Sequence, residues 1–356
     1  MLEVADIFRL HGPKYRAQFG NRMLPSHRRA MQDIEQCRTP SLGGQLYYCA
    51  QCAEHRYSYH SCKNRHCPKC QHEQANDWLQ EQQSLLLPVS HFLVTFTLPA
   101  ELRTLARSNQ KTLYNLLFRA SSQALLQLAQ DPRFVGGRLG MVGVLHTWTR
   151  QLLYHPHVHF IVTGGGLTAD GRWRSSRKDF LVPVKALSRI FRAKLRDALK
   201  KTPLFTQVAQ RVWRKDWVVH SEPVGSGAQA FQYLAPYIFR VAISNNRLRK
   251  LENGNVSFTY KESATDQLRH CTLNAQEFIR RFLQHVLPPR FIKVRYYGLL
   301  SPAQRHRLLK ARQLLSATKL KSALVKPLQP LPLLACPQCR APLTLLGPLA
   351  PRGRAP

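Results

Sequence analysis

Two features common in membrane and exported proteins are missing from this chain of 356 residues. No apolar run approaches the ~20 residues that a membrane-spanning helix needs. The chain starts Met1-Leu2-Glu3-Val4-Ala5-Asp6, which lacks the basic stretch and apolar core of a secretory signal. We therefore expect a cytoplasmic protein without a membrane as partner.

Acidic residues are scarce. The chain has 19 Asp and Glu against 53 Lys and Arg, a net charge of +34 that is spread along its length. A field of this sign attracts polyphosphate, so nucleic acid is the first partner class expected and an anionic membrane surface the second. We expect association with the nucleoid. A chain that is disordered throughout is disfavoured, because 44% of its residues are hydrophobic.

The cysteines do not suggest a disulfide framework, because their number, nine, is odd and most stand in short Cys-x-x-Cys pairs. Cys49-x-x-Cys52 and Cys67-x-x-Cys70 are separated by fourteen residues, the spacing of a zinc ribbon or knuckle. We therefore predict one structural Zn²⁺ on Cys49, Cys52, Cys67 and Cys70. Four thiolates leave no open position, so this zinc is not expected to be catalytic.

Further candidate ligands surround this module. Cys37, Cys62, His60 and His66 could complete a second zinc site, or Cys62 and His66 could replace one of the four cysteines. Another pair, Cys336-x-x-Cys339, is only half a zinc site. It could close with a distant ligand or with a second chain, or it could be degenerate, and the sequence favours the last interpretation.

A strict βαβ rhythm is also absent. Strand patterns at residues 91–98, 141–146, 158–163, 217–220 and 256–260 mix with helical patterns at 100–130, 184–200 and after Asn274 and Ser301. This mixture predicts an α+β fold with a mainly antiparallel sheet flanked by helices, preceded by a small zinc-binding domain. The expected domains are a helical, cysteine-rich part (1–84), a catalytic part (85–300) and a basic helix with a Pro-rich tail (301–356).

The strand at the centre of the chain carries two histidines, His157 and His159. Side chains alternate along a strand, so both imidazoles project from one face while Val158 points to the other. Two imidazoles on one face form half of a metal site, and the remaining ligands must come from other segments, substrate or water. Alone, the pattern fits a solvated pair of histidines equally well.

Together, several segments resemble the HUH single-strand nucleases, and in particular the two-tyrosine transposases of rolling-circle insertion sequences. The resemblance spans nearly the whole chain. It is carried by Cys37-Arg38-Thr39, residues 64–70, Phe96-Thr97-Leu98, His146-Thr147-Trp148, residues 155–159, Tyr233-Leu234-Ala235-Pro236-Tyr237, residues 240–245 and Tyr297-Gly298-Leu299-Leu300. It implies an HUH-nuclease-like catalytic domain after a cysteine-rich zinc domain.

The resemblance also implies a chemistry. A tyrosine, Tyr233 or Tyr237, attacks a DNA phosphodiester while Mg²⁺ or Mn²⁺ on His157 and His159 polarises the phosphate. The product is a 5′-phosphotyrosine and a free 3′-hydroxyl, and a second 3′-hydroxyl can rejoin the DNA without ATP. The implied partners are single-stranded or hairpin DNA at the element ends and target DNA.

A third metal ligand is expected from the resemblance. His146, on the neighbouring strand, is the first choice and Gln151 the second, whereas His155 precedes Pro156 and could instead position the turn. The chain also departs from the family pattern. Pro236 stands where a basic residue is common and Phe239 where a histidine is common, which affects the local helix geometry.

Three other functions fit parts of the sequence. A metallohydrolase would need further His and Asp ligands on later parallel strands, and the Gly-punctuated α/β repeat for these is missing. A non-catalytic zinc-ribbon DNA-binding protein would explain the charge and the cysteines but would give the histidines and tyrosines no role. A rolling-circle replication initiator would share the chemistry and differ in the DNA that it serves.

Overall fold

The computed structural model describes residues 2–70, 87–226, 241–262, 265–316 and 334–352. The chain forms two compact units. Unit 1 consists of Met1–His72, Ile243–Val286 and Lys321–Pro356, and unit 2 of Glu73–Ala242 and Leu287–Leu320. In the described part of the chain, no helix combines the length and the apolar character needed to cross a membrane.

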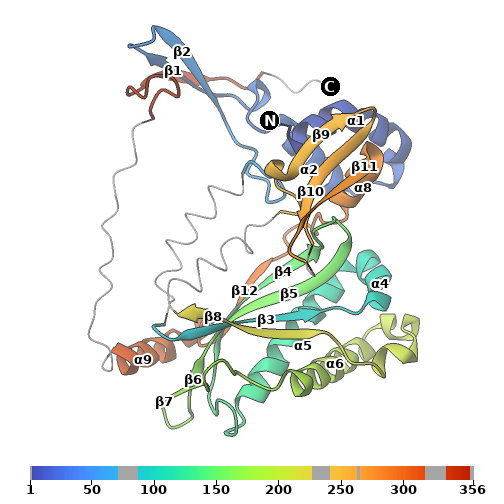
Figure 1. Ribbon diagram of the computed structural model, residues 1–356, viewed down its shortest axis with the longest axis vertical. Coiled ribbons are helices and arrows are strands. Elements are labelled where there is room, and N and C mark those ends of the chain that lie inside the picture. The colour runs from blue at the N-terminus through green and yellow to red at the C-terminus, as the bar shows by residue number, and fades with distance from the viewer. Residues whose placement is uncertain (1, 71–86, 227–240, 263–264, 317–333, 353–356) are drawn as a thin grey trace. The chain divides into compact units, whose positions relative to one another are not determined.

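Unit 2 is built on a five-stranded sheet in which every strand runs antiparallel to its neighbours (Figure 1). The strand order is β12-β4-β5-β3-β8. The strands are β3 (Ser90–Thr97), β4 (Gly140–Trp148), β5 (Tyr154–Thr163), β8 (Val219–Ser226) and β12 (Val294–Gly298). The predicted α+β class with a mainly antiparallel sheet is confirmed.

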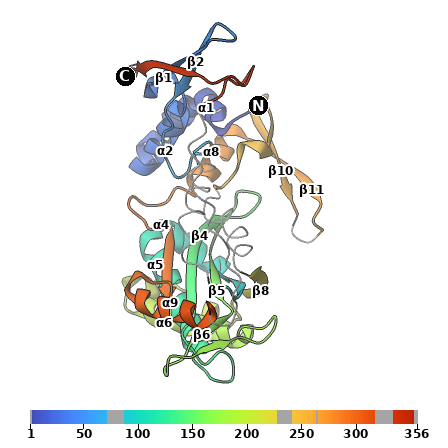
Figure 2. The ribbon, with the colours of Figure 1, turned by 90° about the vertical axis from the view of Figure 1, so that its left-hand side faces the viewer.

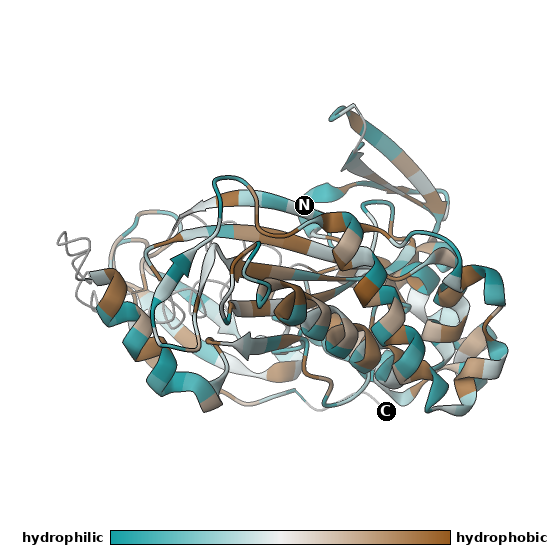
Figure 3. Cartoon of the chain, turned by 90° about the horizontal axis from the view of Figure 1, so that it is seen from below, coloured by the Kyte–Doolittle hydropathy of each residue, from teal (hydrophilic) through white to brown (hydrophobic). Residues whose placement is uncertain are grey.

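One face of this sheet is covered by α4 (Arg103–Ser108), α5 (Gln110–Ala129) and α6 (Val184–Lys200) (Figures 1 and 2). The basic helix predicted at 184–200 is confirmed, and it buries Leu187, Phe191, Leu195 and Leu199, one residue per turn on a single stripe. Phe96 and Phe160 of the sheet meet these helices, with ring centroids 5.1 Å apart between Phe96 and Phe191. Hydrophobic stretches are visible along several strands and helices of the chain (Figure 3).

The opposite face carries a smaller core that includes Val142, Ile161 and two residues of α9 (Arg305–Ser316), Leu308 and Ala311. The basic helix predicted after Ser301 is therefore partly packed on the sheet. Near it, β6 (Gly165–Leu167) and β7 (Trp173–Ser175) form a hairpin around the Asp170-Gly171 turn.

Unit 1 combines α1 (Val4–Phe19), α2 (Pro25–Gln36) and α8 (Ala275–Leu283) with a sheet of β9 (Leu248–Glu252), β10 (Asn255–Lys261) and β11 (Leu268–Asn274). Phe282 of α8 packs edge-on against Phe8 of α1, with centroids 5.2 Å apart. A helix begins after Asn274 as predicted, and Asn274 caps it, because its side chain accepts from the backbone N–H of Gln276 at 2.9 Å.

A second sheet of unit 1 has the order β13-β1-β2, with β1 (Gly44–Cys49), β2 (Glu54–Tyr59) and β13 (Thr344–Leu349). No strand was predicted in the C-terminal segment that supplies β13. Because β13 pairs with β1 and α8 packs on α1, the contacts group the chain differently from the three consecutive domains that the sequence suggested.

Candidate metal centres

Three histidines meet on the sheet face of unit 2 that α9 also covers. His157 and His159 lie on β5 as predicted, and His146 of β4 pairs with His157 across the strands. One ring nitrogen of each residue lies within 4.8 Å of those of the other two. The ladder between β4 and β5 shifts register between His146 and Trp148, opposite Pro156, which cannot donate to a ladder. This irregularity lies beside the three imidazoles.

Two of the three rings are oriented by an oxygen on their Nδ1 side. The Nδ1 of His157 lies 2.6 Å from the carbonyl oxygen of His155. A carbonyl only accepts, so Nδ1 carries the hydrogen and the lone pair of His157 is at Nε2. The Nδ1 of His159 lies 2.8 Å from the hydroxyl oxygen of Thr95 on β3. Metal-binding histidines commonly have such an oxygen partner.

The cluster is partly withdrawn from solvent, because His146 is 2% exposed and His159 is 9% exposed. The rings of His157 and His159 have centroids 4.7 Å apart, and His146 lies 4.9 Å from His159. Trp148 stacks on His146 at 4.7 Å, and the ammonium group of Lys293 lies 5.4 Å from the centre of the Trp148 ring. A cation therefore lies beside the ring that stacks on His146, and no local sequence pattern indicated it, because Lys293 is distant in the chain.

His155 and Gln151 were the other candidates for a third ligand. The Nδ1 of His155 accepts from the guanidinium of Arg103 at 2.6 Å. Burial and the charge of Arg103 lower the pKa of His155 to about 4. This residue is thus a neutral partner of Arg103 at neutral pH. Gln151 lies in the β4–β5 loop, where its backbone N–H donates to Thr149 at 3.3 Å. The role of His146 as third ligand stays a prediction.

The two predicted nucleophiles, Tyr233 and Tyr237, fall within residues 227–240 and so lie outside the described residues, as do Pro236 and Phe239.

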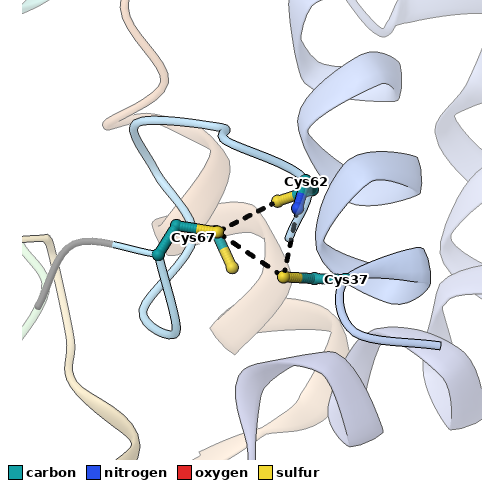
Figure 4. Close-up of side chains that lie close together, drawn as sticks. Cys37, Cys62 and Cys67 are labelled. Carbon is teal, nitrogen blue, oxygen red and sulfur yellow. Dashed lines mark hydrogen bonds between the residues drawn. The ribbon is translucent and has the colours of Figure 1, made fainter. Parts of the chain in front are cut away.

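The cysteines form two clusters, and neither is the predicted set of Cys49, Cys52, Cys67 and Cys70. The first cluster contains Cys37, Cys62, Cys67 and Cys70. Its sulfur atoms come from Cys37 at the end of α2 and from the loop that follows β2, and Figure 4 shows those of Cys37, Cys62 and Cys67 pointing toward one another. The Sγ of Cys70 lies 3.5 Å from that of Cys37 and 3.6 Å from that of Cys62.

These distances suit zinc, because four sulfurs about 2.3 Å from a tetrahedral centre stand roughly 3.8 Å from one another. The four thiols perturb one another: hydrogen bonds from Cys62 and Cys67 lower the pKa of Cys37 to about 7, and hydrogen bonds from the neighbouring cysteines hold that of Cys70 far below its usual range. Hydrogen bonds within the same cluster raise the pKa values of Cys62 and Cys67. Cys37 and Cys62 therefore join a cluster, as the second-site prediction had it. His66 is not part of it, and its backbone N–H donates to Asn64 at 2.9 Å.

The second cluster contains Cys49, Cys52, Cys336 and Cys339. The prediction that the C-terminal pair is degenerate was wrong, and so was the assignment of Cys49 and Cys52 to one site with Cys67 and Cys70. The physical reason is the pairing of β13 with β1, which carries the C-terminal pair to Cys49 and Cys52. Among the described residues, Cys271 of β11 belongs to neither cluster.

Comparison with known proteins assigns the chain to a family. Residues 7–98 match the family described as "Transposase zinc-binding domain", and residues 140–307 match the one described as "Putative transposase". "Putative transposase y4qJ" of Sinorhizobium fredii is 40% identical over 335 residues, which cover 88% of this chain and 84% of that protein. This chain belongs to the transposase family.

A second relative of this transposase is "Transposase for insertion sequence element IS801" of Pseudomonas savastanoi pv. phaseolicola. It is 31% identical over 286 residues, covering 74% of this chain and 68% of that protein. No solved structure matches the transposase. The histidine triad lies inside the match at 140–307, and the first cysteine cluster lies inside the match at 7–98, whereas Cys336 and Cys339 lie outside both.

Proposed function

We propose that this transposase cuts single-stranded DNA at the ends of an insertion element and rejoins it to target DNA through a 5′-phosphotyrosine intermediate. The observation that carries the proposal is the convergence of His146, His157 and His159 on one sheet face, with an oxygen on the Nδ1 side of two of the rings. A purely structural zinc-ribbon protein would have no use for this arrangement.

The chemistry of the three imidazole donors indicates which of the two expected metals, Mg²⁺ or Mn²⁺, fits the site better. Three imidazoles without a carboxylate fit Mn²⁺ better than Mg²⁺, because Mg²⁺ strongly prefers oxygen ligands. A divalent ion held there would polarise the scissile phosphate and stabilise the charge that develops on it. His157 and His159 would supply Nε2, and His146 would close the site from β4.

The covalent step follows from the proposed nucleophile. The hydroxyl oxygen of Tyr233 or Tyr237 forms a bond to phosphorus, and the bond to the 3′-oxygen breaks. The tyrosine proton is lost and the departing 3′-oxygen gains one, which leaves a 5′-phosphotyrosine and a 3′-hydroxyl. A 3′-hydroxyl of another strand then attacks the same phosphorus and releases the tyrosine. The number of phosphodiester bonds is conserved, so no nucleotide cofactor is needed.

Unit 2 also offers a basic surface to hold the strand. A cavity of about 590 Å³ is lined by Arg138, Arg307 and Lys310, among other residues. Arg307 and Lys310 belong to α9, which packs on the sheet face that carries the triad. Cationic grooves of this kind follow the phosphates of a single strand. Lys293 adds a cation beside Trp148, the ring that stacks on His146.

The test is a covalent-adduct assay. The protein is incubated with Mn²⁺ and oligonucleotides labelled on the 3′ side of the scissile bond, and a labelled protein band that survives denaturation is expected. Mass spectrometry should place the adduct on Tyr233 or Tyr237. Label on another residue, or the absence of any adduct on a range of single-stranded and hairpin element ends, would overturn the proposal. Joining of the labelled strand to a second DNA distinguishes a strand transferase from a simple nuclease.

A further inference from the structure

Two parts of the chain that are almost three hundred residues apart meet in unit 1 through their cysteines. The Sγ atoms of Cys49 and Cys339 lie 3.4 Å apart, and those of Cys52 and Cys336 lie 3.9 Å apart. All four sulfurs lie within 4.8 Å of one another. Around a tetrahedral zinc ion, thiolate sulfurs stand roughly 3.8 Å from each other. The four thiols therefore already have the spacing of a zinc site.

The two Cys-x-x-Cys turns share one backbone feature, a residue of positive φ directly after the second cysteine. Ala53, directly after Cys52, has φ 52°, and Arg340, directly after Cys339, has φ 63°. Both residues take the left-handed conformation, which costs energy in a non-glycine residue. In the C-terminal turn, the N–H of Arg340 donates to the carbonyl of Cys336 at 2.8 Å, and the N–H of Cys336 donates to Ala341 at the same distance. The segment is thus folded as a knuckle and is not a degenerate remnant.

Contacts other than those of its cysteines also hold the C-terminal segment against β1 and β2. β13 pairs with β1 from Gly44 opposite Leu349 to Tyr48 opposite Thr344, and the red C-terminal strand runs beside β1 in Figures 1 and 2. The guanidinium of Arg56 on β2 donates to the side-chain oxygen of Gln338, inside the knuckle, at 2.6 Å. Gly43 is required for this approach, because a Cβ there would lie 2.6 Å from the carbonyl oxygen of Leu349.

The ligand class follows from the donors. Cys49 and Cys336 are 0% and 1% exposed, so two of the four sulfurs are withdrawn from water. Four thiolates are the ligand set of structural zinc and leave no position for substrate. The three-stranded sheet β13-β1-β2, with both knuckles at one end, is small, and a module of this size depends on a staple such as a metal ion.

We propose that Cys49, Cys52, Cys336 and Cys339 bind a second structural zinc ion, in a zinc ribbon that the C-terminal segment of the chain closes. The first site, Cys37, Cys62, Cys67 and Cys70, is encoded within the first 72 residues. The second requires residues 334–349. The zinc-binding part of this transposase therefore becomes complete only after its C-terminal segment has been synthesised. This inference does not depend on the proposed DNA chemistry.

Metal analysis of the full-length protein, purified without chelator, tests the proposal. Two zinc ions per chain are expected. The double variant Cys336→Ser/Cys339→Ser should retain one, and so should Cys37→Ser/Cys62→Ser, which removes the other site. Cys271→Ser is the matched control and should retain two. Two zinc ions in the Cys336→Ser/Cys339→Ser protein would overturn the proposal.

A second measurement uses the unchanged protein, so its result does not depend on whether the variants fold. Cys49, Cys52, Cys336 and Cys339 should resist alkylation by N-ethylmaleimide until a chelator is added, whereas Cys271 should give the same labelling with and without the chelator. Peptide mapping reports each cysteine separately. Rapid labelling of Cys336 and Cys339 in the metal-loaded protein, or their recovery as disulfides from protein kept under reducing conditions, would contradict a zinc ribbon.

Discussion

The hydroxyl oxygen of Thr95 lies 2.8 Å from the Nδ1 of His159, and the two residues face each other across β3 and β5. This contact fixes the orientation of a proposed metal ligand from a neighbouring strand. Thr95→Val keeps the shape of the side chain and removes the oxygen, so metal affinity should fall by about 10- to 100-fold. Thr95→Ser should restore most of it.

The measurement for Thr95 is the Mn²⁺ concentration that gives half-maximal DNA cleavage. The maximal rate at saturating Mn²⁺ should change much less than this concentration. Equal Mn²⁺ dependence in the Val and Ser variants would show that the hydroxyl does not orient His159.

The histidine pair gives a second prediction. His157→Ala combined with His159→Ala should abolish cleavage, because the proposed metal loses two of its three protein ligands. DNA binding and thermal unfolding should change little, since the rings contribute less to the core than Phe160 and Val158 beside them. His270→Ala, which changes an exposed histidine of β11 in unit 1, is the control. Cleavage that persists in the double variant, or in excess chelator, would contradict the metal assignment.

The tyrosines give a third prediction. Tyr233→Phe and Tyr237→Phe should each leave some cleavage but strongly reduce complete strand transfer, because two sequential transesterifications need two nucleophiles. The double change should remove the covalent adduct. A phenol with a pKa of about 10 is mostly protonated at neutral pH, so cleavage by either single variant should still require the metal. An undiminished adduct in the double variant would exclude both tyrosines as nucleophiles.

Salt dependence gives a fourth prediction. Binding should favour single-stranded or hairpin DNA over blunt duplex, and it should weaken steeply with salt, because released counterions supply much of the affinity. Lys310→Gln, in the basic cavity, should reduce the slope of log K against log salt by about 0.7 for a lost single-strand phosphate contact. Lys185→Gln, exposed on α6 against the other sheet face, should leave it unchanged. Equal salt-dependence slopes for the two variants would show that the DNA does not contact this cavity.

Acid stability gives a fifth prediction, centred on His91 of β3. Burial lowers the pKa of His91 to about 4, against about 6.5 in an unfolded chain. Above pH 6.5 both states are neutral. As the pH falls from about 6.5 to 4, the unfolded chain takes up a proton that the folded chain does not, so stability should fall by about 3 kcal/mol.

The His91→Gln variant should lack this contribution, so its free energy of unfolding should depend less on pH between 6.5 and 4. Denaturant unfolding at a series of pH values measures the difference. His270→Gln, on an exposed strand position, should follow the unchanged protein. If the free energy of unfolding of His91→Gln depends on pH as steeply as that of the parent protein, His91 is not the buried neutral group that causes the loss of stability in acid.

The sequence by itself determined the features that local periodicity and composition control. Alternation along a strand placed His157 and His159 on one face, and one apolar residue per turn gave α6 its buried stripe. Local sequence also determines the cap at Asn274 and the Asn253-Gly254 turn before β10, because caps and turns depend on residues a few positions apart. The α+β class followed from the order of such elements.

Only the tertiary structure decided which segments share a site. Thr95 contacts His159 through strand pairing, and Lys293 contacts Trp148, which stacks on His146; no local pattern reports either contact. The cysteines show the limit most clearly, because spacing along the chain paired Cys49 and Cys52 with Cys67 and Cys70. Their partners are instead Cys336 and Cys339, since β13 hydrogen-bonds to β1 across almost the whole length of the chain. Cys-x-x-Cys spacing determines a knuckle, and the packing of the folded chain determines which two knuckles meet.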